Sequence, residues 1–199
     1  MANYPDRSEA IKLLHEYTKT DSLRRHALGV EQSMRKMADK YNGDPDEWGL
    51  TGLMHDFDYE MYPTMEDHPF RGNEILIEKG YPESITKAIM GHATYTGVSR
   101  DTDMANSLFS VDELTGFIFA VTYVRPSKSI LEVKPKSVKK KLKQKWGVKS
   151  NFQLFISINK KEHPRNTSFS LFVFAALCIN LLYLICQYCV SEVLGIGSL

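Results

Sequence analysis

The stretch "EWGLTGLMHDFDYE", residues 47–60, places a histidine and an aspartate side by side at the end of an apolar run. His55 and Asp56 are both residue types that bind transition metals, and two further acids, Asp58 and Glu60, follow at once. What this pair does depends on the rest of the chain. The question is whether other ligand-type residues lie at spacings that bring them to the same point.

Helical periodicity surrounds this stretch. Residues 21–41 place apolar side chains at intervals of three or four, and His26 lies on the same stripe. A helix is expected after a Ser8 cap, and residues 44–60 restart a helix with Asp44 or Asp46 as its cap. Residues 104–124 form the most apolar helix, and a short basic helix starts near Ser137. Because period-2 alternation is scarce before residue 150, the predicted fold class is all-α.

The composition favours one cytoplasmic domain with a basic segment. The chain has 199 residues, enough for one domain with a substantial core. Residues 1–124 carry 12 basic and 21 acidic side chains, whereas residues 125–149 carry ten basic and one acidic. The polar N-terminus lacks an apolar signal region, so we expect a cytoplasmic body. Cysteines occur only near the C-terminus, which argues against a disulfide framework or a cysteine zinc site: Cys178, Cys186 and Cys189.

Ligand-type residues recur on separate predicted helices. A helix bundle can direct such side chains inward to one point, and imidazole with carboxylate suits Mn, Fe, Co, Ni or Zn. Each residue also has a structural interpretation: a single histidine is often a core or surface residue, His68 can cap a helix beside Pro69, and Asp112 can be an N-cap. The metal hypothesis therefore depends on their joint occurrence. The candidate ligands are His26, His55, Asp56, His68, His92 and Asp112.

The order His…His-Asp…Asp on successive helices resembles the HD-domain superfamily of metal-dependent phosphohydrolases. The neighbouring segments "GHATY", "VDELTGFIFAVTYVRPSK" and "VKPKSVKKKLK" resemble sequences of the HDIG-type branch of this superfamily. The resemblance covers residues 20–145. It implies an HD-domain helix bundle that holds one or two divalent transition metals. Many relatives read His-Asp-x-Gly-Lys, but this chain has Phe57, Asp58 and Tyr59 after the pair. A lysine that contacts phosphate is therefore not expected here.

The resemblance also implies a division of the ligands between two ions. His26, His55, Asp56 and Asp112 would hold the first ion. Asp56 would bridge to a second ion bound by His68 and His92. Asp58 or Glu113 is a candidate for orienting the ligand imidazoles from outside.

The predicted activity is hydrolysis of a nucleotide or another small phosphate ester by a metal-activated water. The candidate catalytic residues are Asp56, Arg25 and Lys128, with Arg125 and Lys134 as further basic groups for phosphate. An alternative is a binuclear-iron oxygenase, because some relatives with this ligand set hold two irons and use dioxygen to break a C–C or C–P bond. Another is a non-enzymatic module in which the basic segment binds nucleic acid or an anionic membrane.

Nucleic acid is not the expected partner, because only Trp146 lies near the basic segment for base stacking. The chain divides into a metal-binding helical domain, residues 1–146, and a divergent apolar C-terminal tail, residues 147–199. Residues 166–191 carry no charge and are long enough to anchor the body to a membrane, with Lys160, Lys161 and Arg165 on the cytoplasmic side. A core helix and a shifted-frame tail foreign to the domain are the other interpretations. The oligomeric state is not predicted.

Overall fold

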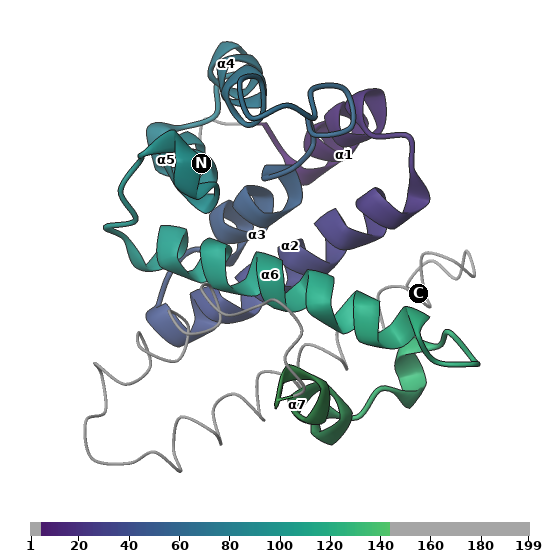
Figure 1. Cartoon of the computed structure of the whole chain (residues 1–199). Helices are drawn as coiled ribbons and strands as arrows, with labels where there is room; N and C mark the ends of the chain where they lie inside the picture. The colour runs from purple at the N-terminus through teal and green to yellow at the C-terminus, as the bar shows by residue number, and fades with distance from the viewer. Residues whose placement is uncertain (1–4, 144–199) are drawn as a thin grey trace, which may run out of the picture. The chain divides into compact units, whose positions relative to one another are not determined.

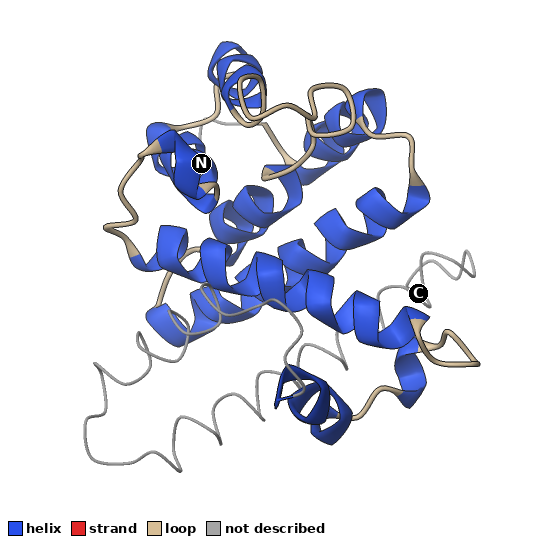
Figure 2. Ribbon diagram, viewed as in Figure 1, coloured by secondary structure: helices blue, strands red, loops and turns tan. Residues whose placement is uncertain are grey.

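Helices provide all the regular secondary structure in residues 5–143, which are the residues that the computed structural model describes (Figure 2). The all-α prediction is confirmed. The chain divides into two units, Met1–Asp112 and Glu113–Leu199, whose described parts are residues 5–112 and 113–143. The predicted boundary at residue 146 and the apolar stretch 166–191 lie outside the described residues and stay predictions. None of the helices within residues 5–143 combines the length and apolar character needed to cross a bilayer.

The first unit starts with two helices (Figure 1). Helix α1 spans Arg7–Tyr17 and α2 spans Asp21–Tyr41. Asp6, rather than the predicted Ser8, caps α1: its side chain accepts from the Glu9 N–H, while the Glu9 carboxylate accepts from the Asp6 N–H. The reason is the reciprocal capping box, which satisfies donors on both residues. Helix α2 ends at Tyr41, and the next residue, Asn42, has a left-handed conformation (φ 55°) that turns the chain.

Helix α3, Pro45–Met54, is the central helix of the first unit and contacts α1, α2 and α5. Asp44 caps it by accepting from the Asp46 N–H at 2.8 Å, and Pro45 occupies the first turn. A helix surrounded by other helices must be buried on every face, which explains the near-continuous apolar run. The buried residues are Trp48, Gly49, Leu50, Thr51, Gly52, Leu53 and Met54.

The helix predicted over residues 44–60 is wrong beyond Met54, because the chain leaves α3 there and continues in turns. Phe57 is buried, and its carbonyl accepts from the Thr18 hydroxyl at 2.8 Å. The Glu60 carboxylate accepts from the backbone N–H groups of Lys19 and Thr20 at 2.8 and 3.0 Å. These bonds hold the segment after His55 against the residues that precede α2. They give Glu60, one of the two acids that follow the His-Asp pair, a structural role.

The remaining elements of the first unit are short helices followed by the first half of α6. Helix α4 spans Phe70–Glu78, α5 spans Glu83–His92, and the 3-10 turn η1 spans Thr94–Thr96. Helix α6 spans Asp103–Tyr123 and begins in the first unit. Asp112 lies well inside α6, so it is not an N-cap. Pro69, rather than His68, stands at the cap position of α4.

The second unit, residues 113–143, contains the rest of α6, the 3-10 turn η2 at Ile130–Glu132 and helix α7 at Pro135–Lys143. Helix α7 thus starts slightly before the predicted Ser137. The Arg125 guanidinium donates to the Ser137 hydroxyl at 2.8 Å, which ties the end of α6 to α7. Buried apolar side chains in this unit include Leu114, Phe117, Ile118, Val121, Val133 and Val138.

Candidate metal centre

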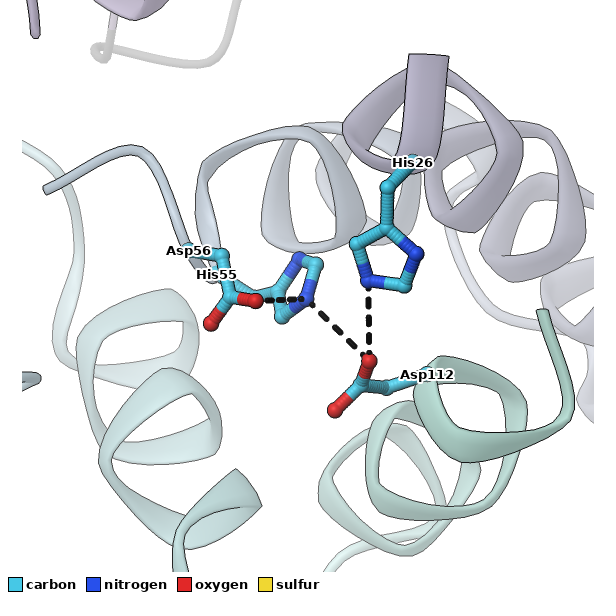
Figure 3. A group of neighbouring side chains, drawn as sticks. All are labelled: His26, His55, Asp56 and Asp112. Atoms are coloured by element: carbon cyan, nitrogen blue, oxygen red, sulfur yellow. Dashed lines mark hydrogen bonds and ion pairs between the residues drawn. The ribbon is translucent and has the colours of Figure 1, made fainter. Parts of the chain in front are cut away.

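The first group of candidate ligands comes from three helices of the first unit (Figure 3). His26 projects from α2, His55 and Asp56 follow the last residue of α3, and Asp112 projects from α6. Nε2 of His26 lies 3.0 Å from Oδ1 of Asp112. Nε2 of His55 lies 3.5 Å from the same oxygen and 3.3 Å from Oδ2 of Asp56. The ligand atoms of these four residues all lie within 4.8 Å of one another.

A second group shares Asp56 with the first. Oδ1 of Asp56 lies 3.3 Å from Nε2 of His68 and 3.2 Å from Nε2 of His92. The two imidazole nitrogens are 3.4 Å apart. Asp56 therefore directs one carboxylate oxygen toward each group, as a bridging ligand would. The structure thus brings together all six residues that the sequence singled out.

The Nε2 atoms of the histidines in this cluster face carboxylate oxygens, which are hydrogen-bond acceptors. Nδ1 of His55 lies 2.8 Å from the Gly52 carbonyl, so Nδ1 carries the proton of the neutral ring and Nε2 presents a lone pair. That Nε2 is buried and makes no hydrogen bond of normal geometry to any of residues 5–143, although two carboxylates lie close by. Lone pairs and carboxylates that converge without a donor need a cation between them. The donor set therefore fits a divalent metal, with both nitrogen and oxygen ligands.

The close carboxylates and imidazoles also shift one another's pKa values. Burial opposes a charge on His55, but the Asp56 and Asp112 carboxylates outweigh burial and raise its pKa well above the ordinary value. Burial likewise opposes ionisation of Asp56 and Asp112, yet the neighbouring His55 holds the pKa of both carboxyls well below the usual range. Burial would lower the pKa of His68, but hydrogen bonds to Asp56 and Asp58 raise it to about 9.

Two residues hold His68 from outside the cluster. The predicted role of Asp58 agrees with its position, since Oδ1 of Asp58 lies 2.8 Å from Nδ1 of His68. Tyr95, which the sequence analysis did not select, donates from its hydroxyl to the His68 carbonyl at 2.8 Å. A tyrosine in "GHATY" carries no signal of this contact, because the bond joins residues 27 positions apart. Glu113, the other candidate for this role, is exposed.

The basic residues proposed for catalysis belong to different units. Arg25 is exposed on α2, immediately before His26. Lys128 and Lys134 are exposed in the second unit, and Lys128 has a left-handed backbone with φ 48°. Contact of Arg25 or Lys128 with a substrate phosphate stays a prediction.

Residues 23–112 match the family model described as the HD domain. The match starts in α2, three residues before His26, and ends at Asp112 on α6. It does not distinguish the HDIG-type branch, which stays a prediction. No curated protein and no solved structure matches the chain.

Proposed function

Because residues 23–112 of this chain are an HD domain, a family of generally metal-dependent hydrolases, we propose that it is a metal-dependent phosphohydrolase. The proposed substrate is a nucleotide or another small phosphate ester. The observation that carries the proposal is the shared Asp56, which has one oxygen directed toward each of two histidine groups.

The charges of the ligand set support a phosphate substrate. When the imidazoles are neutral, the two carboxylates of Asp56 and Asp112 contribute a charge of −2. One divalent ion would neutralise this charge, and two would leave an excess of +2 on the ligand set, or +1 when the buried Asp58 carboxylate beside His68 is counted. Such an excess would attract an anionic phosphate ester and oppose the build-up of negative charge during attack. Arg25 is the nearest basic residue in sequence to a ligand and is proposed to contact the phosphate from α2.

The chain's own residues prepare this site. The Gly52 and Ile89 carbonyls hold Nδ1 of His55 and His92, and Asp58 holds Nδ1 of His68, so each Nε2 faces inward. Asp56 is kept ionised and is therefore available as a ligand over the whole physiological pH range. A bound divalent ion would lower the pKa of a coordinated water and supply a nucleophile near neutral pH.

The experiment measures phosphate release from a panel of nucleotides and simple phosphate esters. Full-length protein is treated with chelator and reloaded with Mn²⁺ or Co²⁺, and Asp56→Ala is assayed alongside. We expect the wild type to cleave at least one ester and Asp56→Ala to lose the activity together with its metal, as measured by elemental analysis. Failure of a metal-loaded wild type to cleave any ester would refute the proposal. Oxygen consumption with an organic substrate would favour the binuclear-iron oxygenase instead.

A further inference from the structure

Asp58 is buried beside the second ligand group, and both of its carboxylate oxygens are bonded. Its side chain is 1% exposed. Oδ1 accepts from Nδ1 of His68 at 2.8 Å, and Oδ2 accepts from the Gly72 N–H at 2.9 Å. We propose that Asp58 is the positioning residue for the second ion, because it fixes the tautomer and direction of the His68 ring. The inference rests on the proposed function, since it takes Asp56, His68 and His92 to hold an ion.

His68 differs from His55 and His92 in the group that holds its Nδ1. His55 and His92 each bond through Nδ1 to the carbonyl three residues earlier, Gly52 or Ile89. Local backbone provides those bonds because both histidines lie at the C-terminal end of a helix, where the last carbonyls have no partner within the helix. His68 follows a non-helical segment and receives a side-chain carboxylate from ten residues earlier instead. A carboxylate makes the imidazole a stronger ligand than a carbonyl does, so the second ion depends on one replaceable side chain.

Gly72 allows this arrangement. It lies in the first turn of α4, where backbone N–H groups have no partner within the helix. A Cβ at Gly72 would lie 2.5 Å from Cγ of Asp58 and 2.7 Å from its Oδ2. The carboxylate could not stay in place next to any larger residue. Asp58 therefore satisfies the start of α4 and orients a ligand at the same time.

An amide at position 58 could not satisfy both partners. His68 and Gly72 each donate to a different oxygen, and asparagine has only one. If its NH₂ group faces Gly72, two donors oppose each other and the link to α4 is lost. If its NH₂ group faces His68, Nδ1 must become the acceptor, which places the proton on Nε2 and removes the lone pair directed at Asp56. Either arrangement weakens the second group and leaves the first group intact.

Isothermal titration of Co²⁺ into chelator-treated full-length protein tests the proposal. The variants are Asp58→Asn and Gly72→Ala, and Glu60→Gln is the matched control. Glu60 lies two residues from Asp58 with the same charge, but it bonds to Thr20 and Lys19 rather than to a ligand. We expect two equivalents in the wild type and in the control. Asp58→Asn and Gly72→Ala should each bind one equivalent with unchanged affinity and the second about 10–100-fold more weakly.

The alternative results have distinct meanings. If the wild type binds two equivalents of Co²⁺ and Asp58→Asn binds both with unchanged affinity, the inference is overturned and the proposed hydrolase still stands. Loss of both equivalents in Asp58→Asn and Gly72→Ala would also overturn it, because Asp58 would then support the fold rather than one ion. A wild type that binds one ion would overturn the inference and leave a mononuclear hydrolase. A wild type that binds none would overturn both proposals.

Discussion

Gly52→Ala is expected to separate α3 from α2 and to disturb the metal centre without changing a ligand. A Cβ at Gly52 would lie 2.8 Å from the Val30 carbonyl oxygen and 2.9 Å from Cγ of Met34, whereas ordinary contacts start at 3.4 Å. The carbonyl belongs to the backbone of α2 and cannot rotate away. The helices must therefore move apart by about 0.6 Å to reach the closest ordinary distance.

The expected cost follows from two opposing effects. Overpacking of this kind destabilises a protein by about 1–3 kcal/mol. Alanine in place of glycine inside a helix stabilises the protein by up to about 1 kcal/mol, because alanine has the higher helix propensity. At the middle of the overpacking range the net loss should be about 1 kcal/mol, which corresponds to a fall in Tm of roughly 2–4 °C. Because His55 follows α3 and His26 lies on α2, the separation should also weaken binding of the first ion.

Gly91→Ala is the matched control, because Gly91 lies inside α5 directly before the ligand His92. A Cβ there would lie 3.2 Å from Cγ of Arg100, whose guanidinium donates to the Gly91 carbonyl at 2.8 Å, so Arg100 needs to shift by only a few tenths of an ångström. We expect this variant to be as stable as the wild type or slightly more so. Urea unfolding and Co²⁺ titration of both variants provide the measurements. A Gly52→Ala variant with wild-type stability and affinity would refute the reasoning, because α2 and α3 would then not be in rigid contact.

Three further outcomes are expected. In metal-free protein the pKa of His68 is about 9 against an ordinary 6.5, because hydrogen bonds to Asp56 and Asp58 outweigh burial. The protonated His68 therefore stabilises the fold fully below pH 6.5, and this contribution is lost as the pH rises through 9. Thermal melts of metal-free protein should show Tm falling between these two pH values. The same fall in Asp58→Asn would contradict a pKa shift that depends on Asp58. Binding of the second ion at pH 7 must displace the extra proton of His68, so the affinity for the second ion should rise by up to about tenfold per pH unit below pH 9. Calorimetric titrations in buffers of different ionisation enthalpy would measure the number of protons released. Asp112→Ala should lose only the first ion and His92→Ala only the second, by elemental analysis, whereas loss of both ions in each variant would argue against two separable sites.

The spacing of apolar side chains along the sequence was sufficient to predict most of the helices. The apolar stripe of α2 and the apolar run of α6 lie in helices that the spacing of their side chains predicts. The cap of α1 was misplaced at Ser8, although Asp6 and Glu9 have the spacing of a capping box. The end of α3 at Met54 carried no comparable signal. The chain turns there because Phe57 and Glu60 bond to residues about 40 positions earlier.

Residue type and periodicity are local properties of the chain, so they are enough to predict which donor atoms this protein carries and that residues 5–143 are helical. The structure places those donors together by packing α2, α3 and α6 so that His26, His55 and Asp112 meet around shared carboxylate oxygens. The contact by which Asp58 holds His68, next to a glycine at position 72, is visible only in the folded chain. Distances between residues far apart in sequence depend on close packing, and no local pattern encodes them.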